Sequence, residues 1–127
     1  MNIVILDTKQ LPPGTEFPEI KAIRYGWEQY GEIAPEEIAQ RCWRADIVVS
    51  LATPLTEPQL AGMEKLKLIV LPVGADRLVD IDAVQRRGVK VCAVAGDWKT
   101  PAGASVWCQA VADTIDSFMR GEPSKTP

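Results

Sequence analysis

Short runs of Val, Ile and Leu, each separated from the next by a segment of helical pattern, constrain the fold of this sequence most strongly. Short continuous apolar runs are typical of strands buried on both faces, as in a parallel sheet that helices cover. The last run alternates in part and is therefore predicted to lie at an edge of the sheet. Residues 22–27 form a weaker strand candidate. The runs cover residues 3–6, 47–51, 68–71 and 89–94.

Helical segments fill the gaps between these runs. Their ends carry recognisable signals: Pro in a first turn, a capping box, an N-cap Asp and glycines after the last turn. The predicted helices are residues 35–43, a short one after Thr56 and Gln59, one from Asp80 to Gly88, and a long one from Gly103 or Ala104 to Arg120.

The alternation of strands and helices predicts an α/β fold. A flavodoxin-like, doubly wound parallel sheet of about five strands in the order 2-1-3-4-5, with helices on both faces, satisfies it. In such sheets ligands bind beyond the carboxyl ends of the strands. The loops at those ends are residues 7–14, 50–57, 72–76 and 95–103.

The length of 127 residues fits one domain, which we expect over residues 1–120. Residues 121–127 are polar and contain two prolines, so we expect a mobile tail there. The net charge is −3 and there is no basic stripe, which argues against a nucleic-acid partner. The apolar runs are too short for a membrane span, and no signal peptide is apparent.

The chain has no histidine, which excludes a Ser-His-Asp triad and any His-ligated metal site. The chain has three cysteines, an odd number at wide spacings: Cys42, Cys92 and Cys108. We therefore expect reduced thiols and a cytoplasmic protein. Three cysteines are too few for a structural zinc site. We therefore predict no metal centre.

Nucleotide-binding motifs are absent from the sequence. Neither Gly-x-Gly-x-x-Gly nor the Gly-Lys-Ser/Thr pattern occurs, and the two glycines of residues 95–103 are too far apart for either scheme. A phospho-receiver domain shares the expected sheet, and Asp7 fits its first acidic position in part. The third strand, however, ends without the carboxylate that would accept a phosphoryl group.

Several short pieces of the sequence follow one another in a specific order. Together they resemble the substrate-binding domain, also called the catalytic domain, of the D-isomer-specific 2-hydroxyacid dehydrogenases, over roughly residues 1–109. The pieces are residues 34–37, 45–49, 53–56, 66–69, Gly74, 79–83 and 87–92.

The resemblance implies one half of a two-domain enzyme. In that family an inserted Rossmann domain holds NAD and carries the catalytic Arg, Glu and His. This chain ends where that portion would begin, and Gln109 stands where the family often has His. We therefore expect no catalytic residue and no cofactor site in this chain, with NAD present only if a partner chain supplies the Rossmann domain.

The resemblance also implies a small-carboxylate site made of backbone N–H groups. Its turn corresponds to Val73, Gly74 and Ala75, and the loop after the third strand adds Ala52 and Thr53. The adjacent Asp76 repels an anion unless Arg77 offsets its charge. The alternative is a packing turn that keeps only the geometry.

The last helix carries an apolar stripe of Trp107, Val111, Ile115 and Phe118 that needs a cover. Folding back onto the sheet supplies one, and so does pairing or exchange with a second copy. We predict a homodimer through this helix.

Three functions remain open at this point. The first is a free-standing, non-catalytic relative of the substrate domain that binds a small 2-oxo or 2-hydroxy acid. The second is the substrate half of a split NAD-dependent dehydrogenase completed in trans. The third is a dimeric interaction module without a ligand.

Overall fold

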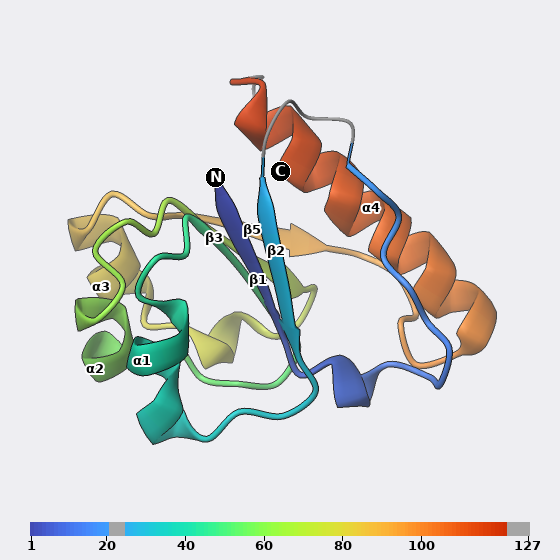
Figure 1. The fold of residues 1–127 in the computed structure, drawn as a ribbon, viewed down its shortest axis with the longest axis horizontal. Helices are drawn as coiled ribbons and strands as arrows, with labels where there is room; N and C mark the ends of the chain where they lie inside the picture. Colours follow the sequence, from blue (N-terminus) through green and yellow to red (C-terminus); the bar gives the residue numbers. More distant parts are fainter. Residues whose placement is uncertain (21–24, 122–127) are drawn as a thin grey trace.

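The computed structural model describes residues 1–20 and 25–121, and a parallel sheet forms its centre (Figure 1). The strands lie in the order β2-β1-β3-β4-β5, and all neighbouring pairs are parallel. The predicted fold class and strand order are therefore confirmed. The strands are β1 (Asn2–Leu6), β2 (Gly26–Tyr30), β3 (Ile47–Ser50), β4 (Leu68–Pro72) and β5 (Lys90–Val94).

The burial of the strands follows from their place in the sheet. The central strands β3 and β4 are buried along their whole length, as their continuous apolar runs predicted. The edge strands β2 and β5 have exposed positions, and the partial alternation of β5 identified it correctly as an edge. The second strand, β2, covers Gly26–Tyr30 and overlaps the end of the candidate at 22–27; residues 22–24 of that candidate and residues 122–127 of the expected tail lie outside the described residues.

Three short helices cover one face of the sheet. They are α1 (Ile38–Cys42), α2 (Glu57–Ala61) and α3 (Ile81–Arg86), with the 3-10 turns η2 (Pro35–Glu37) and η3 (Asp76–Leu78) before α1 and α3. Figure 1 shows the three helices together on the side of the sheet opposite the long helix. Their buried residues pack with Val4, Val48 and Ile69 into one core cluster.

The predicted helix caps form. The Asp80 side chain accepts a 3.1 Å hydrogen bond from the Ala83 N–H at the start of α3, and Gly88 adopts a φ of +70° just after its end. At α2 the Gln59 side chain accepts from the Thr56 N–H at 3.1 Å. Local sequence signals therefore set the ends of both helices.

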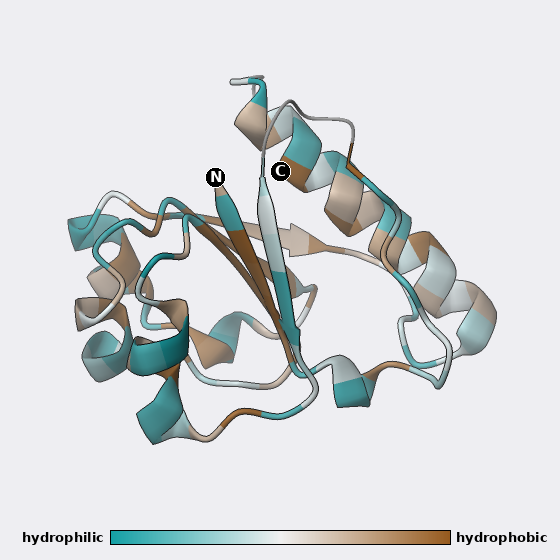
Figure 2. Cartoon of the chain, viewed as in Figure 1, coloured by the Kyte–Doolittle hydropathy of each residue, from teal (hydrophilic) through white to brown (hydrophobic). Residues whose placement is uncertain are grey.

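The helix α4 (Pro101–Met119) covers the other face. Where a helix would connect β1 to β2, the chain instead forms the 3-10 turn η1 (Thr8–Gln10) and then a segment that packs Leu11, Phe17 and Ile20 beside α4. Figure 2 shows hydrophobic strands between these two covers. The sheet therefore has helices on both faces, as predicted.

The long helix starts earlier than the sequence pattern suggested. Thr100 is the N-cap, and its side chain accepts a 3.1 Å hydrogen bond from the Gly103 N–H, with Pro101 in the first turn. Gly103 lies inside that turn and must be glycine, because an added Cβ would come within 1.8 Å of the Asp97 carbonyl oxygen. The glycine that was expected to start the helix is therefore a close-contact position within it.

The apolar stripe of α4 is covered by the chain's own sheet. Trp107, Val111 and Ile115 are fully buried, and Phe118 packs partly buried at the edge of the same cluster. The large hydrophobic residue exposed on α4 is Val106. The helix folds back within one chain, so the stripe supplies no driving force for a dimer. The homodimer itself stays a prediction.

Candidate functional site

Three loops meet at the carboxyl ends of β1, β3 and β4. The Leu55 N–H donates to the Leu78 carbonyl at 2.7 Å, and Leu55 and Val79 form an isolated parallel bridge. These contacts join the loop after β3 to the loop after β4. The strand order reverses direction between β1 and β3, so the ends of these strands flank the topological switch point, where sheets of this class bind ligands.

Asp7 fills the space between the ends of β1 and β3. Its side chain is buried, and Oδ2 accepts from the Ala52 N–H at 2.9 Å and from the Thr53 N–H at 2.8 Å. Its Oδ1 accepts from the Thr53 hydroxyl at 2.7 Å. The buried Ser50 hydroxyl donates to the Thr53 carbonyl at 2.8 Å and holds the loop in place. Two of the five backbone N–H groups predicted for a ligand are thus bonded to the chain's own carboxylate.

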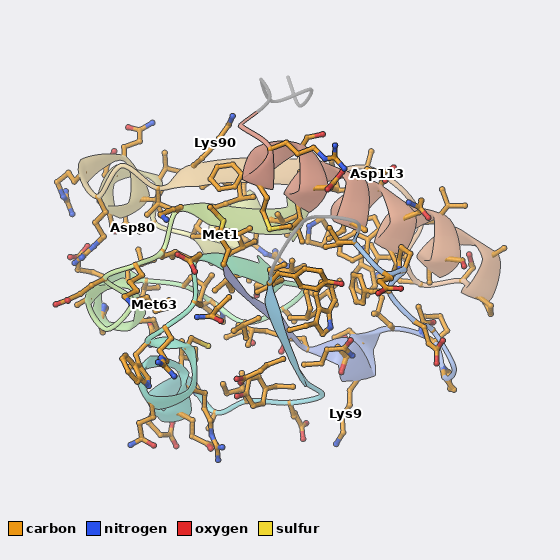
Figure 3. The ribbon with its side chains drawn as sticks, turned by 45° about the horizontal axis from the view of Figure 1, so that its top comes forward. Met1, Lys9, Met63, Asp80, Lys90 and Asp113 are labelled. Atoms are coloured by element: carbon orange, nitrogen blue, oxygen red, sulfur yellow. The ribbon has the colours of Figure 1, made fainter. Side chains whose placement is uncertain are left out.

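The backbone of Asp7 is also unusual. Its φ is +65°, and it is the one non-glycine residue with a positive φ in the described part of the chain. Such a conformation costs about 1–2 kcal/mol for a residue with a Cβ. Lys9 points away from the body of the molecule (Figure 3) and pairs with Glu32 at 3.2 Å. Only neutral donors therefore satisfy the Asp7 carboxylate among the described residues.

The turn after β4 leaves one of its three predicted N–H groups open. The Val73 N–H donates to the Val94 carbonyl and the Ala75 N–H to the Pro72 carbonyl, both at 3.1 Å. Gly74 is exposed, has a φ of +91°, and its N–H has no acceptor among the residues that the structure describes. The turn thus keeps the glycine conformation but offers a single backbone donor.

The two charged residues after this turn do not neutralise each other. Asp76 and Arg77 are both exposed at the start of η3, and neither forms an ion pair within the described part of the chain. The negative charge of Asp76 therefore faces solvent beside Gly74, as the sequence suggested.

Two residues outside these loops have structural roles. Trp98 is partly buried beside Trp107, at 6.4 Å between ring centroids, and Lys99 lies over its ring. Gln109 is exposed on α4 and donates to Asp113 at 2.9 Å, on the outward side of the helix (Figure 3). Neither Trp98 nor Gln109 lies on the three loops that form the candidate site.

A hollow of about 300 Å³ lies between β2 and α1, apart from the loops after β3 and β4. Trp43 lines it and is 55% exposed. Tyr30 donates to Glu28 at 2.6 Å in the same hollow, and this hydrogen bond to the carboxylate raises the pKa of Tyr30 to about 12. Both residues belong to β2, so this hydrogen bond runs along one wall of the hollow.

The free thiols predict a pH dependence of stability. Burial, with the charge of Glu28 added, raises the pKa of Cys42 to about 11, and burial raises the pKa of Cys108 to about 11. The unfolded thiols lose their protons near the ordinary value of 9.0, so their contribution to stability is complete below that pH and is lost as the pH rises through 11. We expect the free energy of unfolding, measured with urea, to fall over this range. The Cys42→Ala/Cys108→Ala variant should decline less steeply, and an equal slope would contradict the assignment.

The described residues hold no group of three His, Cys, Asp or Glu side chains placed to bind a metal ion. Among the same residues, no helix has the length and apolar character needed to cross a membrane.

The parallel sheet in the order β2-β1-β3-β4-β5, with helices on both faces, defines the class of flavodoxin-like α/β domains, and comparison with known proteins narrows this class. The family model of the D-isomer specific 2-hydroxyacid dehydrogenase catalytic domain matches residues 4–127. The chain belongs to this family. It is 29% identical over 96 residues to a Haemophilus influenzae protein named as a 2-hydroxyacid dehydrogenase, an alignment that covers 76% of this chain and 30% of that protein.

Solved structures share the fold. The NAD+-bound 3-phosphoglycerate dehydrogenase of Entamoeba histolytica has a TM-score of 0.57 at 18% identity, covering 72% of this chain and 32% of that one. The apo D-lactate dehydrogenase of Escherichia coli has a TM-score of 0.52 at 20% identity, with 75% and 31% covered. The chain spans about a third of the length of these relatives.

Proposed function

We propose that this chain is an acid-holding domain that has no dehydrogenase activity by itself and binds a small 2-oxo or 2-hydroxy acid weakly at the turn after β4. Membership of the catalytic-domain family supports the choice of ligand class. The observation that carries the proposal is the open N–H of Gly74, exposed at the carboxyl edge of the sheet.

The affinity expected of this site is low. Four of the five predicted backbone donors, those of Ala52, Thr53, Val73 and Ala75, already bond within the chain. One neutral N–H with an opposing carboxylate nearby contributes little against the entropy lost on binding. We therefore expect a dissociation constant on the order of 1 mM or weaker, which corresponds to about 4 kcal/mol.

Substituting Gly74 by Ala is expected to abolish this binding. Ala at a φ of +91° is strained, so the turn rearranges and its N–H changes direction. Calorimetric titration with glyoxylate, pyruvate, lactate and glycerate measures the loss. Val73→Ala is the matched control because the Val73 side chain is 63% exposed and its backbone N–H is kept.

The charge of Asp76 beside the turn is tested in the same titration. Asp76→Asn removes a like charge and should tighten binding of the acid. If the wild-type chain gives no heat with any of the four acids at millimolar concentration, the ligand-binding proposal is wrong.

The turns after β3 and β4 do not suit a dinucleotide. A pyrophosphate needs several open N–H groups at a glycine-rich strand-to-helix turn. The turn after β3 has its Ala52 and Thr53 N–H groups bonded to Asp7, and the turn after β4 has one open N–H. We propose that NAD, if it takes part, is held by another chain or domain. In that case this chain is the substrate half of a split enzyme.

An interaction module without ligand is the second candidate. The bonded amides and the exposed Val73 at the carboxyl edge favour it. The predicted homodimer through α4 belongs to this reading, and a monomer in gel filtration at high micromolar concentration would refute it. A cytoplasmic location also stays a proposal, supported by the buried Cys42 and Cys108, which form no disulfide.

A further inference from the structure

The loop after β3 has converging hydrogen-bond donors of the kind that bind an anion. It directs the N–H groups of Ala52 and Thr53 and the Thr53 hydroxyl at one point, and the Asp7 carboxylate occupies that point at 2.7–2.9 Å. The Asp7 side chain, which follows β1, and the loop after β3 therefore meet at the switch point of the sheet. A ligand of an α/β protein ordinarily binds there.

We propose that this loop is a carboxylate-binding site that the chain fills with its own Asp7, so that the native protein is closed to small acids at its switch point. Asp7 is connected to the loop across two strands rather than along the chain, since 45 residues separate it from Ala52. The loop binds the carboxylate through hydrogen bonds alone, because Asp7 forms no ion pair with a cationic side chain among the described residues.

The backbone of Asp7 supports this reading. A buried side chain held by three short hydrogen bonds retains a left-handed φ of +65° that its Cβ disfavours. Glycine adopts that φ without strain. Asp7→Gly therefore removes one methylene and one carboxylate, which together have the heavy atoms of acetate, and glycine keeps the same backbone conformation without strain.

The inference is independent of ligand binding at Gly74. The Asp7 carboxylate accepts from Ala52 and Thr53 and makes no hydrogen bond to the Gly74 turn, and the Gly74→Ala variant retains Asp7. A failure of either proposal therefore leaves the other one standing.

The test is rescue by free acetate. Asp7→Gly should unfold at lower urea concentration than the wild type in sodium chloride. Sodium acetate at the same ionic strength and pH should raise its midpoint in a saturable way, while the wild-type midpoint stays the same. With acetate at 100 times its dissociation constant, the ratio of folded to unfolded chain rises about 100-fold. Asp7→Ala leaves a methyl group behind and should respond to formate instead.

Two further variants identify the donors. Thr53→Val in the Asp7→Gly background removes the hydroxyl donor and should weaken the acetate response. Asp46→Gly is the matched control, because Asp46 is also buried but its carboxylate accepts from one backbone N–H, that of Asn2, and pairs with Lys67. The acetate response of this control should be the smaller one.

Two outcomes would overturn the inference. The first is a midpoint of Asp7→Gly that is the same in acetate and chloride; the second is an equal acetate response in Asp46→Gly. If Asp7→Gly does not fold in chloride, circular dichroism in acetate decides: recovered structure supports the proposal, and its absence contradicts it.

Discussion

Replacing Trp107 by alanine is expected to lower the free energy of unfolding by about 3–5 kcal/mol, the range for removal of a large buried aromatic side chain. Trp107 is fully buried, and its ring centroid lies 6.4 Å from those of both Phe17 and Trp98. Its Nε1–H donates to the Val94 carbonyl at 3.0 Å. The indole thus connects α4, β5 and the segment that precedes β2.

The loss should depend on packing more than on the hydrogen bond. The Val94 carbonyl also accepts from the Val73 N–H, so Trp107→Phe leaves that acceptor partnered and should cost less than the alanine variant. Val106→Ala is the control because Val106, on the same helix, is 69% exposed and should change stability by less than about 0.5 kcal/mol. Guanidinium unfolding followed by circular dichroism measures all three. Equal losses for Trp107→Ala and Val106→Ala would show that α4 does not pack on the sheet.

The fold was predictable because its signals are local or periodic. Continuous apolar runs identify buried strands such as β3 and β4, and the caps at Asp80 and Gly88 depend on residues a few positions apart. The predicted start of α4, at Gly103 or Ala104, was too late because a glycine is typical of a helix boundary. The N-cap is Thr100, and Pro101 follows in the first turn.

The candidate site was less predictable. The Gly74 turn was found through a family resemblance, and its positive φ fits the expectation. The pairing of Asp7 with Ala52 and Thr53 was missed, since an acid after a strand is common and its partners lie on a different strand. A signal existed in the small polar residues that follow both β1 and β3, adjacent strands in the predicted order. The structure, and not the sequence, shows that the Asp7 side chain accepts hydrogen bonds from the loop after β3.

The 127-residue chain is expected to transfer no hydride between NADH and a 2-oxo acid above the uncatalysed rate. Positioning the two reactants can supply effective molarities of about 10⁵–10⁸ M, and this chain positions at most one of them. The turns after β3 and β4 offer a single open N–H, that of Gly74, for any anion. Loss of NADH absorbance with pyruvate or glyoxylate measures the rate, and the full-length E. coli D-lactate dehydrogenase is the positive control.

Turnover that coelutes with the chain and disappears in Gly74→Ala would contradict this expectation, because it would require a nicotinamide site within these residues. Turnover that is unaffected by Gly74→Ala would instead indicate a contaminating enzyme. The informative case is activity that appears only when a separate nucleotide-binding domain is added. The open edge at Val73 and Gly74 would then be the surface that meets that domain, and Val73→Asp should suppress the activity by placing a charge in the apolar contact while leaving the Val73 N–H in place.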